Sequence, residues 1–190
     1  MNTKSLIIEK ATVLFQQKGY KSVGLNELLK VCNVTKGALY HHFPNGKEEL
    51  LIACLQALNE AITTDIENIF RRYPLTIEAT QGMIEKLIHN LETEGTITGY
   101  TFSSIVSEMA TVSEPVRKAC SVLYENIQHI YCVKLIAEGY SDESAAAIAL
   151  MMTATIEGAM LLCLTQKSSA PLKTIAKMLP NVLKTFNTEN

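Results

Sequence analysis

Apolar residues recur along most of the chain at intervals of three and four, which is the spacing of one face of an α-helix. Close to the N-terminus, Ile7, Ala11, Leu14 and Phe15 form the first such stripe, and Gly19 is placed to end it as a C-terminal cap. No stretch shows the apolar–polar alternation that is typical of a strand. The pattern predicts an all-α protein of about nine helices.

Turn residues divide this pattern into separate helices. After a short second helix at 25–32, Thr35 is a good N-cap for a third that runs to about His42, and 44–46 (Pro-Asn-Gly) form a sharp break. A long fourth helix then begins at Lys47, with two acidic residues in its first turn. Later breaks predict helices near 76–92, 101–112, 115–138, 142–166 and 171–187, the last kinked at Pro180.

Residues 24–43 have the pattern of a helix-turn-helix. Leu28 and Leu39 face each other across the turn and set the angle between two short helices. Asn33 lies where the chain reverses, and asparagine tolerates the left-handed backbone that such a turn needs. The second short helix, about 35–42, has few apolar residues. Two helices that only pack together in an ordinary bundle would need more of them. We therefore expect it to be a recognition helix that enters the major groove of duplex DNA.

The expected DNA contacts follow from the chemistry of each residue. Thr35 starts the recognition helix and leaves backbone N–H groups for a phosphate, while Lys36 supplies charge and Gly37 permits close approach to base edges. The phenol and imidazole groups that follow suit phosphates or bases, and Lys47 can neutralise a further phosphate. The full set of expected DNA-binding residues is Gly24, Asn26, Thr35, Lys36, Gly37, Tyr40, His41, His42 and Lys47.

The segment V34-TKGALYHHF43 resembles, almost letter for letter, the signature around the recognition helix of the TetR family of bacterial regulators. The extra residue in F43-PNGKEEL50, together with I156-EGAMLLCL164, resembles the LmrA/YxaF branch of drug-responsive repressors. Two positions depart from the family pattern: Gly24 stands where a Ser or Thr usually caps the second helix and touches phosphate, and Leu29 replaces a usual alanine. Position 24 is therefore expected to contact DNA through its backbone alone.

The resemblance implies a DNA-binding domain at 3–63 and an effector-binding and dimerisation domain at 64–190. It further implies a homodimer on a near-palindromic operator, released by a small apolar or drug-like effector. Repression is the usual outcome in the family, and activation stays open. The effector cavity is expected among Phe102, Met109, Tyr124, Ile127, Tyr131, Met151 and Met160, for each of which ordinary core is the alternative. The dimer interface is expected at Ile148, Met152, Ile156, Leu161, Leu172, Ile175 and Leu179.

The apolar stretch 145–164 is nearly long enough to span a bilayer. Glu157 near its middle would be costly in lipid, and neither flank carries clustered Lys or Arg. We therefore expect a helix with one side on the chain's own core and the other on a second subunit, and no membrane partner. Glu157 has two interpretations: a counter-charge for a cationic ligand, or a paired or capping group at the interface.

The charge distribution agrees with a protein that holds DNA by one end. Residues 1–50 contain seven lysines and four acidic residues, a net charge of +3, although the whole chain carries −2. A hydrophobic content of 47% is high for a soluble protein of this length, which favours self-association. The five cysteines are scattered without disulfide or metal-ligand spacing, so we expect a reducing cytoplasm and no metal site.

Enzyme motifs are missing from the sequence. No nucleophile elbow, phosphate-binding loop, zinc-protease helix or dinucleotide fingerprint occurs, and His89 and His129 have no acid–base partner at motif spacing. The chain is therefore expected to be neither an enzyme nor a cofactor protein. The rival class is a helical interaction module that does not bind DNA.

Overall fold

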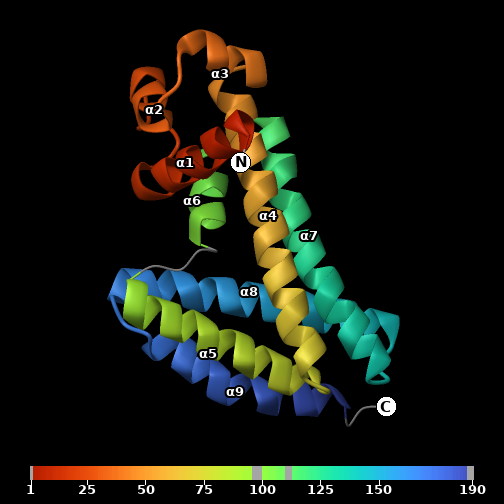
Figure 1. Ribbon diagram of the computed structural model, residues 1–190. Coiled ribbons are helices and arrows are strands. Elements are labelled where there is room, and N and C mark those ends of the chain that lie inside the picture. The colour runs from red at the N-terminus through yellow and green to blue at the C-terminus, as the bar shows by residue number, and fades with distance from the viewer. Residues whose placement is uncertain (1, 96–99, 110–112, 188–190) are drawn as a thin grey trace. The chain divides into compact units, whose positions relative to one another are not determined.

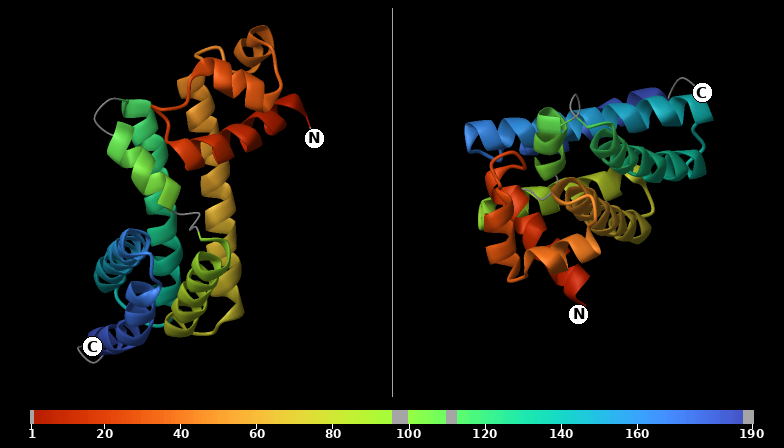
Figure 2. Two further views of the ribbon diagram at one scale, coloured as in Figure 1. Left: turned by 90° about the vertical axis from the view of Figure 1, so that its left-hand side faces the viewer. Right: turned by 90° about the horizontal axis from the view of Figure 1, so that it is seen from above.

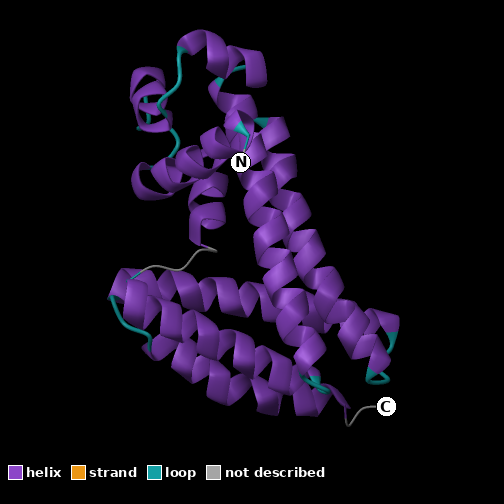
Figure 3. Cartoon of the chain, in the orientation of Figure 1, coloured by secondary structure: helices purple, strands orange, loops and turns teal. Residues whose placement is uncertain are grey.

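The computed structural model describes residues 2–95, 100–109 and 113–187 of the 190-residue chain (Figure 1). Within these ranges the backbone forms helices and loops and no strand (Figure 3). The helices are α1 (Thr3–Lys18), α2 (Leu25–Cys32), α3 (Lys36–His42), α4 (Lys47–Arg72), α5 (Thr76–Glu94), α6 (Tyr100–Met109), α7 (Glu114–Ala137), α8 (Asp142–Gln166) and α9 (Ala170–Asn187). The all-α prediction is confirmed, and the predicted end of the sixth helix at 112 lies outside the described residues.

Several helix ends follow directly from capping residues in the sequence. The Asn2 side chain accepts a hydrogen bond from the Ser5 N–H at the start of α1, and the Ser141 hydroxyl accepts one from the Ser144 N–H at the start of α8. Gly19 ends α1 with its N–H bonded to the carbonyl of Phe15. α9 continues through Pro180, and the kink expected there stays a prediction.

The chain separates by its contacts into two compact units, described one at a time. The first comprises residues 1–61 with 101–123. Its core is built by apolar residues of α1–α4, where α1 packs against α2, and by α6 and the first part of α7: Ile7, Ala11, Leu14, Phe15, Leu28, Leu39, Leu50, Leu51, Ile105, Val116 and Leu123 are buried. Residues 101–109 and 113–123, which were expected in the C-terminal domain, belong by their contacts to the same unit as the N-terminal helices.

The second unit comprises residues 62–100 with 124–190. Within it α9 packs against both α8 and α5, as Figure 1 and the two further views in Figure 2 show. The N-terminus of α5 is capped from a distance, because the Glu138 carboxylate accepts hydrogen bonds from the N–H (2.5 Å) and the hydroxyl (2.6 Å) of Thr76. This bond ties the start of α5 to the segment that follows α7.

α8 is the central apolar helix of the second unit. Within the described ranges it is the one helix whose length and composition would suit a membrane span. Nine of its 25 residues are nevertheless buried among the chain's own helices: Ala145, Ile148, Ala149, Met152, Thr153, Ile156, Ala159, Met160 and Cys163. This face is therefore core, as expected for one side of a helix buried on two sides.

Candidate nucleic-acid interface

α2, the turn after it and α3 have the geometry of a helix-turn-helix. Asn33 ends α2 in the left-handed conformation (φ 54°, ψ 49°), which asparagine adopts more readily than most residues. Leu28 on one helix and Leu39 on the other are completely buried. Both features were expected from the sequence, and both leucines belong to the core of the first unit.

The surface of α3 is almost entirely polar. Leu39 is the one buried residue among its seven, His42 is half-buried, and Lys36, Gly37, Tyr40 and His41 are exposed. A helix that contributes a single anchor to the core leaves the rest of its surface for another molecule. The groups it presents are an ammonium, a phenol and imidazoles, which suit phosphate oxygens and base edges.

The start of α3 leaves room for a close approach. The hydroxyl oxygen of Thr35 accepts a hydrogen bond from the N–H of Ala38 at 3.2 Å, which confirms Thr35 as the N-cap. A Cβ placed on Gly37 would have only the Thr35 hydroxyl oxygen within 4 Å, at 3.9 Å. Open space therefore lies over this turn, as expected for a helix end that meets the floor of a groove.

The start of α2 shows the departure that the sequence indicates. Gly24 is an exposed, extended N-cap residue (φ −79°, ψ 156°) and makes no side-chain capping bond. Asn26 in the first turn is also exposed. Any contact of position 24 with DNA must come from its backbone, so this part of the interface stays a prediction.

Lys47 differs from its expected use. Its ammonium donates hydrogen bonds to the carbonyl oxygens of Tyr20 and Val23, each at 2.7 Å, and lies 4.0 Å from the centroid of the Tyr20 ring. Burial lowers the pKa of Lys47, and the negative charge of Glu108 partly opposes this shift. Two of its three N–H bonds therefore hold the loop between α1 and α2, and the predicted phosphate contact is left with the third.

Glu108 of α6 is a functional residue that the sequence did not predict. One oxygen of its carboxylate accepts a hydrogen bond from the Lys21 N–H at 3.1 Å. The other lies 2.6 Å from where a Cβ on Gly19 would be, so a side chain at 19 would collide with it. Because Glu108 and Lys21 are 87 positions apart, no local pattern indicates their contact. Glu108 and Lys47 together fix the α1–α2 loop that precedes the helix-turn-helix.

Among the expected effector residues, five lie in the second unit, and some of them make polar contacts. Tyr131 is buried, its hydroxyl contacts the Met83 sulfur at 3.4 Å, and its ring lies 5.1 Å from that of Phe70. The Tyr124 hydroxyl donates to Glu157 at 3.5 Å, and burial, with a smaller effect from the charge of Glu157, raises the pKa of Tyr131. Ile127 and Met160 are buried in the same unit, and Met151 is half-buried.

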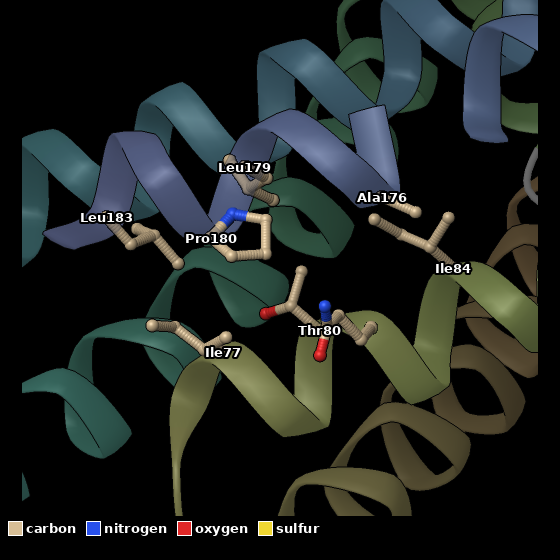
Figure 4. Close-up of a pocket in the computed structure, with 8 residues that line it drawn as sticks. Ile77, Thr80, Ile84, Ala176, Leu179, Pro180 and Leu183 are labelled. Atoms are coloured by element: carbon tan, nitrogen blue, oxygen red, sulfur yellow. The ribbon is translucent and has the colours of Figure 1, made fainter. Parts of the chain in front are cut away.

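The two remaining effector candidates fall elsewhere. Met109 is buried in the first unit, and the side chain of Phe102 lies outside the described residues. A narrow gap does occur between α5 and α9, where Thr80 faces Pro180 (Figure 4), but it has no room for a ligand. It is lined by Ile77, Thr80, Gln81, Ile84, Ala176, Leu179, Pro180 and Leu183, none of which was an expected effector residue.

Most of the expected dimer residues prove to be core of the single chain. Ile148, Met152, Ile156, Leu172 and Leu179 are at most 5% exposed, so a partner cannot reach them. Ile175 is half-buried, whereas Leu161 is 48% exposed. Among the residues of these two helices whose burial is described, the large apolar side chains that are exposed are Leu150, Leu161 and Leu162 on α8 and Met178 on α9. Because most of α8 is apolar, its periodicity does not indicate which face is core, and the position of the dimer interface stays a prediction.

Comparison with known proteins agrees with this arrangement. Residues 7–54 match the family model described as bacterial regulatory proteins, tetR family, and residues 76–178 match the C-terminal domain of LmrA/YxaF-like transcriptional regulators. The chain is 34% identical to the HTH-type transcriptional regulator LmrA of Bacillus subtilis and 32% identical to the uncharacterized regulator YxaF of the same species. Each alignment covers 96% of this chain, and 97% and 96% of those proteins.

Solved structures show the same fold. The reduced form of NemR from Escherichia coli superposes with a TM-score of 0.84 at 22% identity, over 95% of this chain and 97% of that one. A TetR regulator from Legionella pneumophila superposes with a TM-score of 0.81 at 20% identity, over 96% and 97%. The helix-turn-helix, the nine described helices and both family matches agree. The chain is thus a DNA-binding transcriptional regulator of the TetR family, with an LmrA/YxaF-like C-terminal domain, and not an enzyme.

Proposed function

We propose that the protein is a cytoplasmic repressor that binds a near-palindromic operator as a homodimer and leaves it when a small apolar or drug-like molecule binds. The observation that carries the proposal is the difference between the exposed surfaces of two helices. α3 gives almost its whole surface to polar groups, while α8 keeps three leucines exposed after its core face is filled.

The exposed leucines support the dimer. Leu150, Leu161 and Leu162 are each about half exposed, at 57%, 48% and 49%, and Met178 of the adjacent α9 is 53% exposed. A second copy of the same face would remove this apolar surface from water. Two subunits would then present two copies of α3, which suits half-sites one helical turn, ~34 Å, apart.

The cluster around Tyr124, Tyr131 and Glu157 supports an effector site in the second unit. Tyrosine and methionine side chains provide adaptable apolar surface, and a carboxylate next to them adds a specific polar contact. A ligand releases DNA only if it prefers the conformation that DNA disfavours, and such coupling is typically ~1–3 kcal/mol. An apolar ligand with one polar group fits these residues.

Selection from random-sequence duplex DNA tests the proposal directly. We expect the protein to enrich a sequence with two-fold symmetry, and a promoter that carries this sequence to be silenced in a bacterial reporter strain that expresses the protein. Aromatic and drug-like compounds are then screened for release of the purified protein from the selected duplex. Enrichment of a single unrepeated half-site would contradict the dimer, and activation of the reporter would contradict repression.

A further inference from the structure

The turn between α3 and α4 is tight and well bonded. The N–H of Gly46 bonds to the carbonyl of Phe43 at 2.8 Å, and Gly46 has a positive φ of 72°. The carbonyl of Gly46 accepts the first helical bond of α4, from the N–H of Leu50 at 3.1 Å. The Glu49 carboxylate also accepts a bond from the Asn45 N–H at 2.8 Å, so this turn is anchored to the first turn of α4.

Gly46 is covered by a residue of the recognition helix. It is buried, although the two residues before it, Pro44 and Asn45, are exposed. A Cβ on Gly46 would lie 3.4 Å from Cε1, 3.6 Å from the hydroxyl oxygen and 3.7 Å from Cζ of Tyr40. The Tyr40 ring therefore lies where a Cβ at position 46 would touch it at van der Waals distance.

The contact between Gly46 and the Tyr40 ring affects more than one group on the DNA-facing surface. Tyr40 is 40% exposed despite the contact, so its other side remains open to solvent. The Lys36 ammonium lies 5.9 Å from the centroid of the same ring, close enough for a cation–π attraction. The position of the Tyr40 ring thus influences a phenol and an ammonium on the recognition helix.

We propose that Gly46 is a positioning residue for operator recognition: without a side chain, it seats the Tyr40 ring against the cap of α4 and thereby fixes where the Tyr40 hydroxyl meets DNA. The inference rests on the proposed contact of Tyr40 with DNA. A Cβ alone at position 46 would only touch the ring, so a side chain must extend beyond Cβ, as asparagine does, to displace the phenol where the backbone conformation is kept.

The test compares Gly46→Asn with Gly95→Asn in the full-length protein. Asparagine tolerates a positive φ, and Gly95 has nearly the same φ, 69°, with nothing within 4 Å of a Cβ placed on it. Both variants carry a similar backbone change, but only the first meets Tyr40. Binding is measured by fluorescence anisotropy on the duplex that the wild-type protein selects from random DNA and on an unrelated duplex, with melting temperatures alongside.

We expect Gly46→Asn to lose roughly tenfold in affinity for the selected duplex and less for the unrelated one, because specific contacts carry the discrimination. Gly95→Asn should stay within about twofold of wild type on both, since residues without a shared partner act independently. Tyr40→Ala should also lose roughly tenfold, and adding Gly46→Asn to it should cost no more than about a further twofold, because the group being positioned is already gone.

Additive losses in the double variant, or wild-type affinity for Gly46→Asn alone, would overturn the inference. Wild-type affinity for Tyr40→Ala would overturn it too, since no contact would be left to position. Lys36→Ala on the same duplex separates these failures from failure of DNA recognition by α3. If Lys36→Ala weakens binding while Gly46→Asn does not, α3 is the recognition helix but Gly46 does not position Tyr40.

Discussion

α3 and α8 expose opposite kinds of surface. α3 buries one residue of seven and presents charged and polar groups, which water solvates at little cost. α8 buries nine of 25 residues and still leaves three leucines in contact with solvent, each square ångström of which costs about 25 cal/mol relative to burial. The first surface is therefore stable alone and suits a polyanion, whereas the second would be stabilised by an apolar partner.

This difference means that the two surfaces can be damaged separately. A change on α3 should alter DNA affinity and leave assembly and stability intact. A change on the exposed face of α8 should alter assembly first and DNA affinity only as a consequence, because in the proposed dimer each subunit binds one half-site. Substitutions on each helix can therefore break or sharpen the comparison.

The largest effect is expected from Leu161→Asp. A carboxylate buried in an apolar interface without a partner costs several kcal/mol, so the dissociation constant of the dimer should rise more than about a hundredfold. Sedimentation at micromolar concentration should show a monomer, and binding to a two-half-site duplex should weaken strongly. Val133→Asp is the matched control, because Val133 of α7 is 53% exposed and lies on neither α8 nor α9. A stable Leu161→Asp dimer would show that the interface lies elsewhere.

The next effect separates the two faces of α8 itself. Ile148 is completely buried and Leu150, two residues later, is 57% exposed. Ile148→Ala should lower the free energy of unfolding by about 2–5 kcal/mol through the lost contacts and the cavity. Leu150→Ala should instead weaken dimerisation, so its apparent loss of stability should grow as the protein is diluted. Urea unfolding at two protein concentrations distinguishes them, and equal dependence on concentration would argue against two functional faces.

The sequence predicted the helix-turn-helix in more detail than the body because its signals are local. Thr35 caps α3 through a bond from an N–H only three residues away, and Asn33 adopts the left-handed conformation itself. Leu28 and Leu39 are eleven positions apart. The exposed face of α8 could not be chosen in the same way, since apolar residues occur around most of the helix and only its packing against other helices, such as α9, distinguishes one side.

Long-range polar contacts were also beyond the sequence. The acceptors of the Lys47 ammonium, the carbonyls of Tyr20 and Val23, lie 27 and 24 positions before it, and backbone carbonyls have no signature in a sequence. Lys47 therefore looked like any basic residue near a recognition helix. Glu108 was missed for the same reason, because its acceptor function depends on α6 lying against the α1–α2 loop.

A smaller effect tests two lysines of the DNA-binding unit against each other. Lys36 is exposed at the start of α3, so Lys36→Ala should cost ~1–3 kcal/mol of operator binding and leave the melting temperature unchanged. Lys47→Met should lower the melting temperature, because two charge-assisted hydrogen bonds worth roughly 1–3 kcal/mol are lost. The salt dependence of binding separates them further. The slope of log affinity against log salt concentration should correspond to about one phosphate contact fewer for Lys36→Ala and stay nearly constant for Lys47→Met. The reverse pattern would restore Lys47 as a phosphate contact.

The smallest expected effect concerns communication along α4. The two compact units divide between Ala61 and Ile62, inside this single helix of 26 residues, which at 1.5 Å per residue is ~39 Å long. A rigid helix of that length converts a small tilt at one end into a displacement of several ångströms at the other. If α4 is the lever, Ala57→Gly with Ala61→Gly, both exposed, should leave operator affinity near wild type. The ligand concentration for half-release should rise about threefold to tenfold, within the usual range of coupling energies.

The matched control applies the same change to the other helix that crosses the division. α7 passes from the first unit to the second between Leu123 and Tyr124, so Glu125→Gly with Asn126→Gly weakens it at exposed positions near that point. Each glycine costs up to ~1 kcal/mol of helix stability, so similar melting temperatures in the two variants allow a direct comparison. Both are titrated with one compound that releases the wild-type protein. Release of the α4 variant at the wild-type ligand concentration would exclude the lever. A higher ligand concentration for half-release in the α7 variant alone would place the signal in α7, whose N-terminal part packs in the same unit as α6 and Glu108.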